Sequence, residues 1–187
     1  MPVLQLRDVK ANFSRYRVGE PVPTLTDAQM PTQNQKNHKY LASALLPAIA
    51  PKLRSSVIAN LVSGIHHFSD ASAVFVNEHT VNVGNANYGG AYEDEFGVDE
   101  NKMSGPFLMW KGQLSSDASA GIHSPLLQPG RRIFLFLRSR SASSFYFWGE
   151  LKHATLIRDG TPPVVVGDVV WVVGAQVAMR RCATTWG

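Results

Sequence analysis

The sequence predicts a single α+β domain in which short helices come first and a curved β-sheet follows. Three observations lead to this prediction. The chain has 187 residues, a length that suits one domain. Hydrophobic residues make up 44% of it and charged residues only 17%, so it can bury a core. Apolar residues with helical spacing occur only before residue 70, whereas strand-like runs follow, and this order is typical of α+β folds.

The first 70 residues are expected to form an arm and a helical segment. Residues 1–34 contain several prolines that interrupt any regular element, apart from a short strand near the start. Apolar spacing predicts a helix over residues 40–45, which Pro47 ends or kinks. Pro51 suits the first turn of a second helix, whose apolar face runs over residues 53–65.

From residue 72 the pattern becomes that of strands. The predicted strands are apolar runs separated by loops rich in Gly, Ser and Asn: residues 73–76, 80–83, 107–110, 133–137, 145–149, 151–157, 164–166 and 169–173. The run at 133–137 is apolar on both faces. We therefore expect an arm and helical segment over residues 1–70 and a β domain over 71–187, which together form one compact unit.

Cys182 is the only cysteine, and this excludes several classes of protein. A lone cysteine forms no internal disulfide, and it cannot complete a zinc site that needs two thiolates. Zinc fingers, zinc ribbons and the zinc motif of cytidine deaminases are therefore excluded. No window approaches ~18 uninterrupted apolar residues, and the first 16 residues lack the apolar run of a signal peptide. We expect a cytoplasmic protein with no membrane span and no cofactor.

Charge is distributed unevenly along the chain. Residues 1–54 hold eight Lys and Arg against three Asp and Glu, residues 55–127 hold two against eight, and residues 128–187 again hold eight against three. The net charge is +4. Basic surfaces attract polyanions, nucleic acid above all, although a solvated surface explains the same balance.

Two histidine-containing segments raise the question of catalysis. His66 and His67, with Asn77 and His79 downstream, have the residue types of a His–Asn–His nuclease, but the spacing is too compressed for its metal finger. The histidine pair is instead expected at a helix end, where imidazoles favour the dipole. The glycines of residues 84–90 lack the Lys-Ser/Thr of a phosphate-binding loop, and no serine stands in a nucleophile elbow.

An acidic cluster and an aromatic run are the strongest candidates for binding. Residues 92–96 read Tyr-Glu-Asp-Glu-Phe, and such carboxylates bind a divalent metal, form a solvated loop, or accept a hydrogen bond from the exocyclic amine of cytosine. Residues 145–148 read Phe-Tyr-Phe-Trp. Because alternate residues of a strand face opposite sides, one pair faces the core and the other is available to stack on bases. Four arginines lie just upstream.

These segments resemble one known family. Residues 92–96, followed by Phe-Leu-Met-Trp-Lys-Gly-Gln-Leu-Ser over 107–115, resemble its "Tyr-Glu-Asp-Tyr … Phe-His-Trp-Gln-Ser-Gln-Asn-Ser/Thr" block. Residues 135–138 resemble its "Leu-Phe-Val-Arg" strand, and residues 145–151 its "Phe-x-Tyr-Leu-Gly-x-Val" strand. This is the SRA-like (SET- and RING-associated-like) domain, formerly of unknown function, found at the C-terminus of some modification-dependent restriction helicase-nucleases. The resemblance covers residues 72–172, and it departs from the family's residues at Lys111, Gly112 and Leu114.

The resemblance implies a fold and a function. The fold is a curved, barrel-like, mostly antiparallel β-sheet (SRA/PUA-like) with N-terminal helices. The function is a reader of modified cytosine, which binds double-stranded DNA, flips the base into a pocket and acts with a nuclease partner or fused domain. The implied base-binding residues are Tyr92, Asp94, Trp110, Gln113, Phe145 and Phe147, and the implied phosphate-binding residues are Lys111, Arg131, Arg132, Arg138 and Arg140.

Two other function classes remain open from the sequence. An enzyme, either a metal-dependent nuclease or a base-processing hydrolase, would use Asp94 or Glu95 with His79 or His123. A structural or protein-interaction domain would have no binding pocket at all. A divalent-metal site favours the first class, and a filled sheet interior favours the second.

Overall fold

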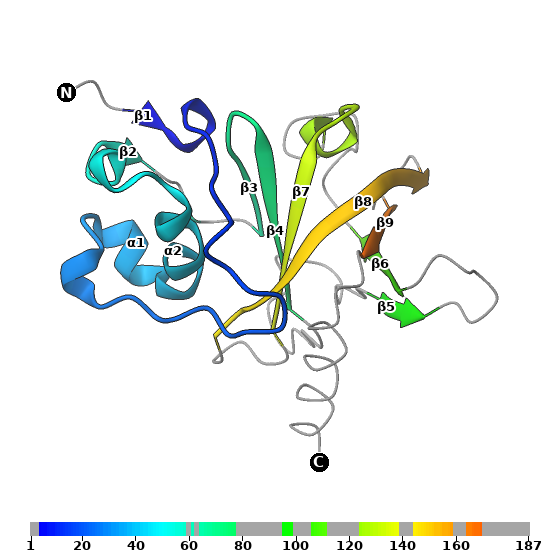
Figure 1. Cartoon of the computed structure of the whole chain (residues 1–187), viewed down its shortest axis with the longest axis horizontal. Coiled ribbons are helices and arrows are strands. Elements are labelled where there is room, and N and C mark those ends of the chain that lie inside the picture. The colour runs from blue at the N-terminus through cyan, green and yellow to red at the C-terminus, as the bar shows by residue number, and fades with distance from the viewer. Residues whose placement is uncertain are drawn as a thin grey trace, which may run out of the picture.

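The chain folds as an open, mixed β-sheet with short helices packed against one face (Figure 1). The computed structural model describes residues 4–58, 61, 64–77, 95–98, 106–111, 124–138, 144–158 and 164–169. The predicted α+β class is confirmed, because the helices precede the main sheet along the chain. None of the helices within these residues is long and apolar enough to cross a membrane.

The main sheet has the strand order β3-β4-β7-β8-β9-β6-β5. Its strands are β3 (Ile65–His67), β4 (Ala71–Asn77), β7 (Arg132–Arg138), β8 (Tyr146–Arg158), β9 (Val164–Val169), β6 (Pro106–Lys111) and β5 (Glu95–Val98). Strands β4 and β7 are parallel, and the other described neighbours are antiparallel.

The predicted barrel is wrong, because the sheet is open and β3 and β5 are its two ends. Strand β8 links the two halves of the sheet. Its first half pairs with β7 as far as Leu151, and its second half pairs with β9 from Leu151 to Arg158. The two halves of the sheet are therefore staggered along one long strand. No pairing joins β5 to β3 among the described residues.

The first of the two predicted helices is present, and a short helix that was not predicted precedes it. Helix α2 (Lys39–Leu45) confirms the helix expected over residues 40–45, and it follows α1 (Gln33–Asn37) directly. Helix α1 begins with a capping box, in which Thr32 and Gln35 exchange side-chain-to-backbone hydrogen bonds. The 3-10 turn η3 (Leu46–Ala48) places Pro47 where α2 ends.

The second predicted helix is wrong. Residues Pro51–Leu53 form only the 3-10 turn η4, after which β2 (Val57–Ile58) pairs in parallel with β1 (Leu4–Gln5). The β-branched pair of β2 suits a strand better than a helix. Further along, Gly64 accepts a hydrogen bond from the Phe75 amide, and a Cβ at Gly64 would lie 2.9 Å from the Phe75 carbonyl oxygen. The close approach of β4 therefore requires a glycine here.

The two strands predicted at 145–149 and 151–157 are one continuous strand, β8. Gly149 makes this possible. It has a φ of +100°, and the register with β7 shifts there, so that Leu135 faces Gly149 while Phe136 faces Phe147. The resulting β-bulge bends the strand without ending it. A Cβ at Gly149 would also lie 3.2 Å from a methyl group of Val18, so that both backbone strain and contact disfavour any other residue.

An aromatic cluster lies between the sheet and the N-terminal residues. Residues 9–26 form an irregular segment between the 3-10 turns η1 (Leu6–Asp8) and η2 (Asp27–Gln29). From here on, the term arm refers to residues 9–26 only. The arm inserts Phe13 against the sheet, where its ring centroid lies 4.4 Å from that of Phe134 and 5.5 Å from that of Phe68. The buried rings that complete this cluster are Phe75, Phe136, Phe145 and Phe147.

The opposite face of the sheet is also buried. Trp148 and Leu135 belong to a second hydrophobic cluster, whose other members are Ile65, Val74, Val76, Leu126, Ile133, Leu137 and Leu151. Strand β7 is therefore buried on both faces, as its uninterrupted apolar run predicts.

The arm also extends the sheet. The Gly19 amide donates to the Phe147 carbonyl at 2.8 Å, the Phe147 amide donates to Glu20 at 3.1 Å, and the Val22 amide donates to Phe145 at 2.7 Å. These bonds occupy the edge of the first half of β8, beyond the point where β9 pairs. The first hydrophobic cluster thus contains residues from both predicted segments, and their boundary at residues 70 and 71 falls in the β3–β4 hairpin.

We predict that Phe13→Ala lowers the free energy of unfolding by about 3–5 kcal/mol, because it removes the ring that joins the arm to the sheet. The measurement is chemical denaturation, with Ser55→Ala as the control. Ser55 is exposed, so its replacement should change stability by less than about 0.5 kcal/mol. If both variants lost equally little free energy of unfolding, Phe13 would not be important for stability.

Candidate nucleic-acid interface

The β5–β6 pairing brings together the two segments that carry most of the implied base-binding residues. Glu95 of β5 pairs with Met109 of β6. Asp94 directly precedes Glu95, and Trp110 directly follows Met109. The strand predicted at 107–110 is confirmed as β6, and it lies beside the acidic segment, as a shared site requires.

Several implied residues lie outside the described part of the chain or are described only by their backbone. Tyr92, Asp94, Gln113 and Arg140 fall outside the described residues. Trp110 and Lys111 occupy the last positions of β6, where they pair with Val165 and Val164 of β9. Their roles stay predictions.

Phe145 and Phe147 do not lie with Trp110. Trp110 pairs with Val165 of β9, and Val165 pairs in turn with Leu156 of β8. Leu156 lies nine residues along β8 from Phe147. At about 3.3 Å per residue, this is about 30 Å along the strand. The two phenylalanines are also only 2% and 5% exposed, inside the aromatic cluster. Their arrangement gives them a packing role and offers no ring face to a base.

Arg131, implied to bind phosphate, instead fastens the β3–β4 hairpin. Its Nε donates to the Ser72 hydroxyl at 3.0 Å, and its terminal nitrogens donate to the backbone carbonyls of Phe68, Ser69 and Ala71. Burial lowers the pKa of Arg131, and Asp70 opposes this effect. Since four of its five N–H groups are already used, the guanidinium has little left to offer a phosphate.

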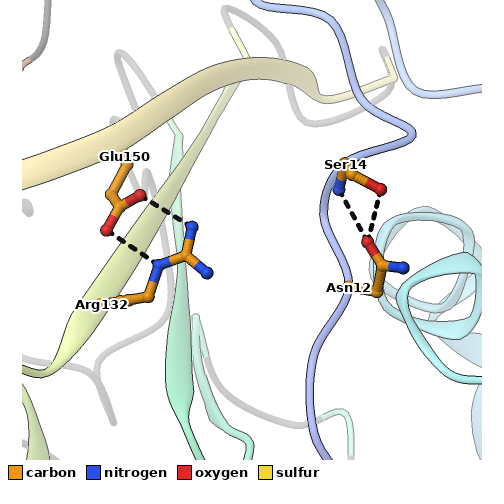
Figure 2. A network of polar contacts seen from close by, with 4 residues as sticks. All are labelled: Asn12, Ser14, Arg132 and Glu150. Atoms are coloured by element: carbon orange, nitrogen blue, oxygen red, sulfur yellow. Dashed lines mark hydrogen bonds and ion pairs between the residues drawn. The ribbon is translucent and has the colours of Figure 1, made fainter.

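Arg132 forms a two-point ion pair with Glu150 across β7 and β8 (Figure 2). Its Nε and a terminal nitrogen lie 3.1 and 2.9 Å from the two carboxylate oxygens, and its guanidinium lies 4.8 Å from the Phe134 ring centre. The hydrogen bond to Glu150 raises the pKa of Arg132. The pair is solvent-accessible, with side chains 54% and 36% exposed, so a phosphate would have to compete with Glu150 for this guanidinium.

Arg138 ends β7 and lies half-buried among aromatic rings. Its guanidinium carbon lies 4.4 Å from the Phe145 ring centre and 5.6 Å from that of Tyr40. Burial lowers the pKa of Arg138, and Tyr40 opposes this effect. Its register partner is Asn77, the last residue of the parallel strand β4. The parallel strands β4 and β7 therefore end at the same edge of the sheet.

The histidine pair lies on strand β3, so its predicted position at a helix end is wrong. The physical reason is that His66 and His67 pair with Ala73 and Ser72 of β4, which makes them part of a strand. His67 Nδ1 lies 2.9 Å from the Ser72 hydroxyl oxygen, and the buried His66 ring meets Phe75 edge-on. Within the described ranges, no three His, Cys, Asp or Glu side chains gather as metal ligands would. His79 and His123 fall outside those ranges.

The site prediction missed three exposed cations of the arm: Lys10, Arg15 and Arg17. They are hereafter the arm cations. The excess of basic residues over 1–54 was a signal for them. Nothing in the sequence shows, however, that the arm is held against the sheet. The three side chains have a defined place on the protein only because the arm is held there.

Comparisons of the chain with protein-family models, with curated proteins and with solved structures find no match. The function must therefore be inferred from the residues of this chain and from their arrangement.

We predict that Arg131→Met lowers the free energy of unfolding by about 2–3 kcal/mol, because it takes the guanidinium donor from the Phe68 carbonyl and leaves the Ala71 carbonyl with only the Phe68 amide. The matched variant Arg132→Met removes an exposed ion pair and should cost less than about 1 kcal/mol. Thermal and denaturant unfolding of both variants gives the comparison. The structural role of Arg131 would be contradicted if Arg132→Met were the more damaging change.

Proposed function

We propose that this chain is a non-catalytic DNA-binding module that reads a modified cytosine flipped out of the double helix. The observation that carries the proposal is the pairing of Glu95 with Met109, since Asp94 precedes the first residue in the sequence and Trp110 follows the second. In this proposal the base is read at the β5–β6 end of the sheet, away from the aromatic cluster.

The residue types at this end suit the recognition of a single base. Flipping a base costs a few kcal/mol of stacking and pairing. An aromatic ring, Tyr92 or Trp110, returns ~1–3 kcal/mol by stacking on the flipped base. The Asp94 carboxylate or the Gln113 amide then accepts a hydrogen bond from the exocyclic amine of cytosine.

The resemblance to SRA-like domains supports the same function. The family-like blocks at residues 92–96 and 107–115 overlap β5 and β6, and those at 135–138 and 145–151 overlap β7 and β8. Each block therefore coincides with a strand of one sheet. In this proposal the chain acts in the cytoplasm, as the reader of a modification-dependent restriction system with a nuclease partner or a fused nuclease domain.

The charge of the chain is compatible with a duplex as partner. The net charge is +4, and basic residues are concentrated in the first 54 and the last 60 residues. Phosphate contacts from such residues set affinity and register, while base contacts supply the preference for one base. A reader of this kind needs both contributions from different parts of its surface.

We predict that Asp94→Asn weakens the preference for modified over plain duplex while leaving the thermal midpoint within about 2 °C, because an amide oxygen is a weaker acceptor than a carboxylate and only the flipped, modified base contacts it. The measurement is a pair of dissociation constants, for duplexes that differ only in the 5-substituent of one cytosine. Asp99→Asn is the matched control, since it makes the same charge change outside the family-like block.

An equal loss of affinity for both duplexes in Asp94→Asn would show that Asp94 does not read the base. A large fall in the thermal midpoint would make Asp94 a structural residue. Strand cleavage by the wild-type chain with Mg²⁺ or Mn²⁺, lost in Asp94→Asn, would replace the reader by a nuclease.

A further inference from the structure

The arm cations Lys10, Arg15 and Arg17 are exposed and uncommitted. None of the three takes part in an ion pair within the described residues. The nearest carboxylates along the chain are Asp8, which accepts a hydrogen bond from the Gln5 amide, and Glu20. The arm itself holds these three cations against one carboxylate, that of Glu20.

The arm is held in place by hydrogen bonds as well as by Phe13. The Asn12 amide donates to the Ala48 carbonyl, and the Ala11 amide donates to the Asp70 carboxylate, each at 2.9 Å. Between Lys10 and Arg15, the Asn12 side chain accepts hydrogen bonds from both the amide and the hydroxyl of Ser14, closing a local turn (Figure 2). The cations are thus carried by a fixed backbone.

A fourth cation, Arg54, acts on the same region. Tyr16 donates its hydroxyl to the Ala44 carbonyl at 2.7 Å, and the positive charges of both Arg54 and Arg15 act on it. Burial raises the pKa of Tyr16, so the phenol stays neutral and supplies no negative charge to balance them. The potential around the arm is therefore positive, which attracts a polyanion.

Two of the arginines implied to bind phosphate, Arg131 and Arg132, are by contrast already engaged. Arg131 donates to three carbonyls and a hydroxyl, and Arg132 is paired with Glu150. A duplex reader needs uncommitted cations for its phosphate contacts, and among the described residues the arm supplies such a set on a fixed segment.

We propose that the arm cations contact the phosphate backbone of duplex DNA and supply affinity that does not depend on base modification. This inference rests on the proposed function only in that duplex DNA is the partner. It holds whether or not the protein reads a modified base. It assigns a task to the N-terminal segment, for which the resemblance to SRA-like domains provides none.

The test is the triple variant K10Q/R15Q/R17Q, measured against plain duplex DNA over a series of salt concentrations. The matched control is K36Q/K39Q/K52Q, which removes the same charge from the helices and the η4 turn. The arm variant should bind plain duplex at least about tenfold more weakly at 0.1 M salt, and the slope of log K against log salt should fall by about 2–3. The ratio of affinities for modified and plain duplex should not change.

Equal losses in the two triple variants, an unchanged salt slope in the arm variant, or no binding of plain duplex by the wild-type chain at low salt would overturn the inference. Arm-dependent binding to phosphatidylserine vesicles without binding to DNA would overturn it as well. If the triple variant unfolds, each single variant should lower the slope by about 0.9, and no change in any of them counts against the inference. Arm-dependent binding without any preference for modified duplex would leave this inference standing and remove the reader.

Discussion

The insertion of Phe13 between the sheet and the helices is the contact on which the rest of this structure depends. The ring touches Phe68 at the β3–β4 turn and Phe134 on β7, so it joins the arm to two separate parts of the sheet. Once the arm is in place, its backbone pairs with the first half of β8, and Val18 comes close to Gly149 at the bulge. The arm therefore occupies the edge of the first half of β8, beyond the point where β9 pairs.

The same contact decides which residues remain free for function. It draws Phe145 and Phe147 into the aromatic cluster, and the neighbouring hairpin turn occupies the donors of Arg131. The two binding surfaces that we propose lie elsewhere, at the β5–β6 end of the sheet and on the arm. In our account the first reads a base and the second holds the phosphates, so specificity and affinity have separate structural origins.

The sequence predicts the strands better than their assembly. The run at 133–137 is apolar on both faces, and a strand buried on both sides is what β7 proves to be. By contrast, residues 53–65 have helical apolar spacing, but β2 and β3 form there because each finds a strand partner distant in the sequence. The sequence of the arm predicts irregular structure and gives no sign of its bonds to β8, because those bonds involve only backbone groups. Likewise, the role of Arg131 depends on carbonyls that the turn at Phe68–Ala71 presents, and no local pattern encodes them.

The central claim is that the arm and the sheet form one cooperative unit, and amide hydrogen exchange of the free protein tests it most directly. Our account predicts that the amides of Gly19, Val22 and Phe147, which bond across the arm and β8, exchange only through global unfolding, as those of β7 do. If Gly19 and Val22 exchanged orders of magnitude faster while β7 stayed protected, the arm would be a loosely attached segment. That result would contradict the account.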